Sequence, residues 1–221
     1  MAVAAERGVE GAEALIRRAG PATLHGDRGP AHLVLDFGRE WVGWLHVALD
    51  ADAPATLRLR YGEDLAEAMR DEPYGAPWVD LPEDRITFGP GSHAGRSQGR
   101  RAFRYVRLVA DGSAAIHISD VRLDSVHYPV REVGSFRCSD EQLNRIWDIA
   151  AHTAKLCCQQ FYEDGLKRDG LLWIGDFRVH QLCTQAAFGE TALARKSLYL
   201  IARSQRADGS VPACAAAGGG H

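Results

Sequence analysis

Apolar and polar residues alternate along much of the first 130 residues of the chain. Residues 56–61 read TLRLRY, which directs leucine and tyrosine to one side and arginine to the other. Strict alternation of this kind predicts a β-strand with one buried and one solvated face. Similar short apolar runs, separated by turn residues, predict further strands at 32–37, 41–49, 85–88, 103–109, 115–118 and 121–126. Such a series predicts an antiparallel, jelly-roll-like β-sandwich.

After residue 133 the apolar positions recur at intervals of three and four. One stripe of apolar and small residues comprises Leu143, Ile146, Trp147, Ala150, Thr153, Ala154 and Cys157. This spacing predicts an α-helix. Ser139 with Gln142 three residues later has the form of a capping box, so we expect the helix to begin there.

Two more helices are predicted further along the chain. The first runs over 176–188, with Asp176 as its N-cap and Gly189 as its terminator, and the second begins at Thr191 and stops near residue 208. The chain is therefore predicted to be an α+β protein. We expect a lead-in segment over 1–29, a β-sandwich domain over 30–133 and a helical domain over 134–221.

Composition and charge narrow the class of protein. Apolar residues make up 46% of the chain and charged residues 25%, which is typical of a globular protein. The formal net charge is −3 and no broad basic surface is predicted, which disfavours a nucleic-acid partner. Five arginines gather over 96–107, where they alternate with apolar residues and indicate a strand with one solvated face.

The cysteines and the N-terminus indicate a cytoplasmic protein. The five cysteines are odd in number and irregularly spaced, and they include no C-x-x-C pair, so we expect reduced thiols and no zinc site. The first 20 residues carry several charges and lack the apolar core of a signal peptide. No apolar run approaches the roughly 18 residues that a membrane-spanning helix needs, so no membrane partner is expected.

Residues 62–82 are predicted to form a long surface loop. They contain three prolines and several acidic residues, together with Tyr74 and Trp78. Long loops on β-scaffolds often carry function, and Trp78 has the shape to stack on a sugar ring. The alternative is that Trp78 packs back onto the sandwich.

The segment between the first two predicted helices contains the candidate catalytic residues. Four carboxylates fall within fourteen residues, among lysine, arginine and one tryptophan; they are Glu163, Asp164, Asp169 and Asp176. Glycoside hydrolysis by inversion uses one carboxylic acid to protonate the leaving oxygen and a second carboxylate, about 6.5–9.5 Å away, to activate water. An aromatic side chain can supply an apolar wall for the sugar. The alternative is a salt-bridged surface loop.

Residues 163–176, EDGLKRDGLLWIGD, resemble the signature of the family 78 α-L-rhamnosidases, which typically reads D-C-P-Q-R-D/E-E-R-L-G-W-T-G-D. Aligning WIGD with WTGD places Asp169 on the family's general acid and Asp176 on its closing carboxylate. Shorter matches occur in the expected order at 35–38 (LDFG), 61–63 (YGE), 103–106 (FRYV) and 208–212 (DGSVP). The resemblance covers roughly residues 30–212.

The resemblance implies a fold and a reaction. The fold is a β-sandwich followed by an (α/α)6 barrel of six helical hairpins, and the reaction is hydrolysis of terminal α-L-rhamnosides with inversion. Asp169 would be the general acid and Trp173 the apolar wall. Substrate-binding residues would be Glu163, Asp164, Arg168, Trp173 and Asp176. The partner is a carbohydrate, and no metal or organic cofactor is implied.

Two departures from the signature bear on activity. Asp169 stands where the family has glutamate, which withdraws the carboxyl group by about 1 Å, and small displacements of this kind impair catalysis. Arg168 replaces an acidic residue. The general base of the family is a glutamate beyond the end of this chain. The isolated chain is therefore expected to show little or no activity.

The residues after Val133 suffice for three or four helices, which cannot close a six-hairpin barrel. Their apolar stripes should stay partly exposed unless something covers them. We expect a truncated chain, a chain completed by a partner or by a homo-oligomer, or a degenerate protein whose helices pack on the sandwich.

Two other functions remain open at this point. In the first, the sandwich is a non-catalytic carbohydrate-binding module that uses the aromatic residues Trp41, Trp44, Tyr74 and Trp78. In the second, the chain is an assembly fragment without a ligand.

Overall fold

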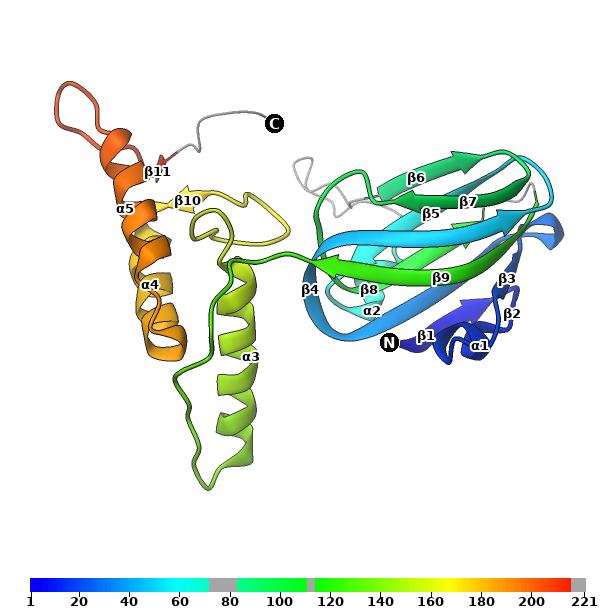
Figure 1. The fold of residues 1–221 in the computed structure, drawn as a ribbon, viewed down its shortest axis with the longest axis horizontal. Coiled ribbons are helices and arrows are strands. Elements are labelled where there is room, and N and C mark those ends of the chain that lie inside the picture. Colours follow the sequence, from blue (N-terminus) through cyan, green and yellow to red (C-terminus); the bar gives the residue numbers. More distant parts are fainter. Residues whose placement is uncertain (72–82, 111–113, 216–221) are drawn as a thin grey trace. The chain divides into compact units, whose positions relative to one another are not determined.

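The computed structural model describes residues 1–71, 83–110 and 114–215, and the chain divides into two compact units, Met1–Ser125 and Val126–His221. Figure 1 shows a strand-rich first unit and a helical second unit. The predicted combination of an antiparallel β-domain and a few helices is confirmed. Tyr74 and Trp78 lie outside the described residues.

Among its described residues, the first unit contains nine strands and three short helical segments. The strands are β1 (Ala2–Arg7), β2 (Val9–Glu10), β3 (Ala22–His25), β4 (Ala31–Ala51), β5 (Ala55–Gly62), β6 (Glu83–Phe88), β7 (Gly91–Arg96), β8 (Arg101–Ala110) and β9 (Ala115–Ser125). The helical segments are α1 (Ala12–Ile16), α2 (Leu65–Met69) and the 3-10 turn η1 (Gly26–Arg28).

The long strand β4 belongs to both layers of the sandwich. Its first half pairs with β1 and β8, and its second half pairs with β9 and β7, antiparallel in every case. One layer therefore has the order β1-β4-β8-β5-β6 and the other β2-β3-β9-β4-β7. The β4–β8 register shifts between Asp36 and Trp41. Irregularities of this kind bend a strand, which lets β4 pass from one layer to the other.

The core lies between the two layers. Leucine, isoleucine and aromatic side chains from both layers form one buried cluster that includes Leu24, Leu33, Leu35, Leu45, Leu57, Leu59, Phe103, Leu108, Ile116 and Ile118. The alternation predicted for 56–61 is confirmed in β5, where Leu57, Leu59 and Tyr61 are buried. On the other side of β5, Arg60 Nε contacts Glu83 Oε2 at 2.6 Å.

The structure divides the chain differently from the sequence prediction. Residues 1–29 are not a lead-in segment, because β1 pairs with β4 from Ala2–Asp36 to Arg7–His32 and β3 pairs with β9. Residues 126–133 belong with the helical unit. The Tyr128 amide donates to the carbonyl of Cys158, and the Val133 amide donates to that of Ala187.

The second unit contains α3 (Glu141–Cys157), α4 (Ile174–Phe188) and α5 (Ala192–Arg203), with β10 (Leu172–Trp173) paired antiparallel to β11 (Cys214–Ala215). All three predicted helices are present. Helix α4 starts earlier than predicted, with Trp173 as its N-cap and Asp176 in its first turn. Gly189 ends it in the left-handed conformation, as predicted.

Apolar side chains remain exposed on these helices, as the sequence predicted. Those more than two-fifths exposed are Leu143, Ile146 and Ile149 on α3, Val179 and Leu182 on α4, and Leu198 and Tyr199 on α5. Homo-oligomerisation stays a prediction. None of the helices in the described residues is long and apolar enough to cross a membrane.

The N-cap of α3 is Asp140, and the predicted Ser139 capping box is wrong. Asp140 Oδ1 accepts from the amides of Gln142 at 2.8 Å and Leu143 at 3.4 Å. We expect Asp140→Ala to lower the free energy of unfolding of the helical unit by about 0.5–2 kcal/mol. Urea denaturation followed by circular dichroism at 222 nm measures this loss. Ser139→Ala is the control and should leave the midpoint unchanged; a loss confined to Ser139→Ala would reinstate Ser139 as the cap.

Candidate active site

A groove of about 850 Å³ runs between α3 and α4. Its walls are mostly small and apolar and include Trp147, Ala150, Ala151, Thr153, Ala154 and Cys157 from α3, and Gly175, Val179, His180, Leu182, Cys183, Ala186 and Ala187 from α4. Three carboxylates also line it, namely Glu163, Asp164 and Asp176. They lie where α3 ends and α4 begins. The groove is therefore apolar along most of its length and acidic at one end.

Glu163 is the deepest of these carboxylates, with 6% of its surface exposed. It follows the buried Tyr162, and its backbone amide donates to the carbonyl of Cys157 in the last turn of α3, at 3.0 Å. Burying a carboxylate costs free energy unless other groups compensate for it, and such residues are often functional. Glu163 is therefore a strong candidate for a binding residue.

Asp164 closes the loop that carries the rest of the signature. Its Oδ1 accepts from the Leu171 amide at 2.8 Å, and its own amide donates to the Leu171 carbonyl at 3.0 Å. This two-way bridge holds residues 165–170 as a closed loop. Asp164 thus supports the local structure and also lines the groove.

Asp169 lies near the end of this loop in a left-handed conformation, with φ 64°, and Gly170 follows with φ 62°. Non-glycine residues with positive φ are strained and cluster at functional sites, although aspartate tolerates the conformation better than most. Asp169 is exposed, and its Oδ1 lies 3.6 Å from Nε of the exposed Arg168. Neither residue lines the groove.

The Cys214 thiol is influenced by two carboxylates of this segment. Burial raises the pKa of the Cys214 thiol, and the negative charges of Asp164 and Asp169 raise it further. Both carboxylates therefore lie within electrostatic reach of the same thiol. Cys214 pairs with Trp173 in the β10–β11 ladder, so Trp173 is held beside this cluster but outside the groove lining.

An aromatic stack behind the carboxylates was not predicted from the sequence. The Tyr162 ring lies 4.5 Å from the ring of His180 and 5.8 Å from that of Phe177. Thr184 Oγ1 donates to the Tyr162 hydroxyl at 2.9 Å. Burial raises the pKa of Tyr162 to about 12. For His180, the sequence did contain one signal. Its four-residue spacing from Asp176 places both residues on one face of a helix.

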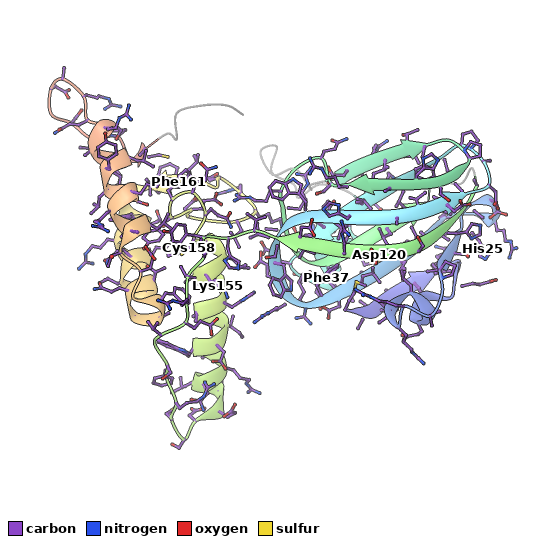
Figure 2. All side chains as sticks on the ribbon, viewed as in Figure 1. His25, Phe37, Asp120, Lys155, Cys158 and Phe161 are labelled. Carbon is purple, nitrogen blue, oxygen red and sulfur yellow. The ribbon has the colours of Figure 1, made fainter. Side chains whose placement is uncertain are left out.

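A cluster of buried side chains around Cys158 supports the segment after α3. Figure 2 labels Lys155 in the last turn of that helix, and Cys158 and Phe161 in the segment that follows. Burial raises the pKa of the Cys158 thiol to about 12, and its Sγ lies 3.2 Å from the carbonyl oxygen of Ala154. Cys158 and Phe161 belong to a buried cluster with Tyr162, Leu172 and Leu193. This cluster fixes the position of Glu163.

The sandwich tryptophans were the alternative candidates for a sugar platform. The Arg39 guanidinium lies 4.7 Å from the centroid of the Trp41 ring, and Trp41 Nε1 donates to the Phe37 carbonyl at 3.4 Å. One face of this ring is therefore covered. Trp44 is half-buried. Within the described part of the chain, no group of three or more His, Cys, Asp or Glu side chains is placed to hold a metal ion.

Two sequence comparisons agree with this architecture. Residues 24–125 match the N-terminal domain of the family 78 glycosyl hydrolase α-rhamnosidases, and residues 131–220 match the six-hairpin glycosidase domain of the bacterial α-L-rhamnosidases. A β-domain followed by helices of a six-hairpin domain defines a class of glycosidases. The chain belongs to glycoside hydrolase family 78. No curated protein sequence matched it.

Solved structures of this family are similar to the chain. A family 78 rhamnosidase of Bacillus sp. GL1 is 32% identical, with a TM-score of 0.74 over 84% of this chain and 19% of the other. A Klebsiella oxytoca rhamnosidase with rhamnose bound is 30% identical, with a TM-score of 0.74 over 83% of this chain and 38% of the other. A Streptomyces avermitilis α-L-rhamnosidase, 20% identical with a TM-score of 0.63 over 89% of this chain and 19% of the other, shares the fold. The chain thus spans less than two-fifths of the length of each.

Proposed function

We propose that this chain supplies the sugar-binding part of an α-L-rhamnosidase-type site, which hydrolyses terminal α-L-rhamnosides with inversion. The observation that carries the proposal is the meeting of Glu163, Asp164 and Asp176 at one end of the α3–α4 groove. Sugar hydroxyls donate hydrogen bonds to carboxylates, and such bonds are stronger than those between neutral groups. The rhamnose bound to the Klebsiella oxytoca rhamnosidase supports the choice of sugar.

In this proposal each residue of the signature has a defined role. Asp169 is the general acid, because it occupies the acid's place in the signature. Glu163, Asp164, Arg168 and Asp176 bind the sugar, and Trp173 forms the apolar wall. Inversion needs a second carboxylate about 6.5–9.5 Å from the acid, on the opposite face of the sugar.

We propose further that the 221-residue chain by itself binds the sugar without hydrolysing it. The family resemblance assigns one catalytic carboxylate to this chain, and inversion needs two. A cytoplasmic location is part of the proposal. It is supported by the five cysteines, all of which are free thiols.

Isothermal titration of the purified chain with L-rhamnose tests the binding site. We expect the wild-type chain to bind, and Glu163→Gln and Asp176→Asn each to weaken binding by about ten- to a hundredfold, since each removes a charged acceptor. Asp148→Asn is the matched control, because Asp148 is an exposed carboxylate on α3 that pairs with Arg137 at 3.1 Å and does not line the groove. Asp169→Asn should also leave binding within about twofold. A folded wild-type chain that binds no rhamnose would contradict the proposal.

Turnover is measured with p-nitrophenyl α-L-rhamnoside. We expect no release of nitrophenol from the isolated chain. Release that disappears in Asp169→Asn would show that a complete site forms, and would overturn the proposed inactivity while supporting the assignment of the acid.

A further inference from the structure

His180 lies in the wall of the groove, one helical turn after Asp176. Its ring packs on the Tyr162 ring at a centroid distance of 4.5 Å and an interplanar angle of 32°. Its Nε2 lies 3.2 Å from the backbone carbonyl oxygen of Ala154 on α3. Contacts with two separate elements therefore hold the ring in one orientation.

The contact with Ala154 determines the tautomer of His180. A carbonyl oxygen can only accept, so Nε2 must carry the hydrogen. Burial lowers the pKa of His180 below its usual 6.5, so the ring is neutral at neutral pH. In a neutral ring with a protonated Nε2, the other nitrogen, Nδ1, has a free lone pair and is an acceptor.

Nδ1 of His180 is available to a ligand. In the part of the chain that the structure describes, none of the hydrogen bonds involves Nδ1. The fully buried side-chain atoms without a partner there are His25 Nε2 and Arg107 Nε, so Nδ1 is not sealed inside the protein. An acceptor held rigidly in the wall of a groove is suited to a ligand that brings its own hydroxyl donors.

We propose that His180 binds the sugar directly, accepting through Nδ1 a hydrogen bond from one ring hydroxyl of a monosaccharide in the α3–α4 groove. Residues four apart on a helix are neighbours on one face, so Asp176 and His180 present two acceptors side by side. Neighbouring hydroxyls of one sugar ring can donate to both. This inference rests on the proposed function and adds a residue to it.

The variant His180→Gln tests this inference. The glutamine amide can keep a donor near the position of Nε2 and so preserve the bond to Ala154, but it lacks an acceptor at Nδ1. We expect L-rhamnose to bind this variant about three- to tenfold more weakly than wild type, the range for one neutral hydrogen bond. His180→Asn, which places its amide near Nδ1, should retain more of the affinity.

Deoxy sugars separate direct contact from a structural role. The analogues of L-rhamnose that lack the hydroxyl at C2, C3 or C4 are titrated into the wild-type chain and His180→Gln. For one analogue the two proteins should bind equally, because the hydroxyl that His180 contacts is missing. Equal losses for every analogue, or no loss for rhamnose, would overturn the inference.

A measurement on the wild-type chain without sugar completes the test. Long-range ¹H–¹⁵N correlation spectra at pH 7, with His180 assigned by comparison with His180→Gln, should show a neutral ring protonated at Nε2. A ring protonated at Nδ1 or at both nitrogens would overturn the inference by itself. Absence of rhamnose binding to the wild-type chain would overturn the proposed function and this inference together, whereas unchanged binding in His180→Gln would overturn this inference alone.

Discussion

Replacing Asp84 with alanine is expected to lower the free energy of unfolding of the sandwich unit by about 3–5 kcal/mol. The Asp84 side chain is completely buried. It accepts from Arg101 through Nε at 3.1 Å and Nη2 at 2.6 Å, and from the Tyr61 hydroxyl at 2.7 Å. Alanine would leave a guanidinium and a phenol with unpaired donors. A loss of this size is a large share of the roughly 5–15 kcal/mol that stabilises a typical domain.

Urea denaturation measures this loss, and Asp36→Ala is the matched control. Asp36 accepts from Arg104 through two bonds of 2.8 Å, but the Arg104 side chain is 39% exposed. A pair in contact with water is screened by it and contributes little, so Asp36→Ala should cost clearly less stability than Asp84→Ala. Similar losses in the two variants would show that burial does not set the strength of these pairs.

The same site should contribute to acid sensitivity. Burial alone would raise the pKa of Asp84, but the hydrogen bonds from Arg101 and Tyr61 and the charge of Arg101 outweigh it and hold the pKa below 3.8. Because the pKa is lower in the folded state, this contribution is fully present above about pH 4 and is lost as the pH falls through the folded-state pKa. In Asp84→Asn the fall in stability below pH 4 should be shallower.

Phe103→Ala is expected to cost about 3–5 kcal/mol, through lost apolar burial and the cavity left behind. The Phe103 side chain is fully buried in β8 between two other rings. The Phe37 ring meets it edge-on at 5.3 Å, and the Tyr61 ring lies 5.1 Å away. Denaturation curves of Phe103→Ala and Phe103→Leu provide the measurement. Leucine refills part of the space and should lose clearly less; equal stability of both variants and wild type would contradict this account of the core.

Several strands were absent from the sequence prediction for a physical reason. Strand β1 reads AVAAER, where valine is the one residue of the β-branched or aromatic kinds that favour strands, and β7 reads GSHAGR, which has none of them. They form strands because their backbones pair with that of β4 through hydrogen bonds. The predicted separate strands over 32–37 and 41–49 are one strand, as are those over 115–118 and 121–126. A turn residue can mark a bend or bulge inside a strand as well as its end.

The arginines of β8 were predicted to line a solvated face, and this was wrong in part. Arg107 is buried and donates to Asp71 Oδ1 at 2.9 Å and to the Met69 carbonyl at 3.1 Å. Alternation predicts which side of a strand a residue faces. It does not predict that α2 and the residues after it will cover that side.

At the candidate site, the sequence determined which groups are present and the helices on which they lie. The spacing of the carboxylates over 163–176, and the family they indicate, could be read directly because they depend on neighbouring residues. Tertiary structure alone decided that Glu163 is buried and that it shares a groove with Asp164 and Asp176. It also decided that Asp169 lies outside the lining of this groove. The orientation of the His180 ring, which depends on its contact with Ala154, was likewise decided by the tertiary structure. These features depend on how α3 and α4 pack, and the contacts between two helices are set by side chains far apart in the chain. Periodicity along one helix reports only the face that each residue occupies.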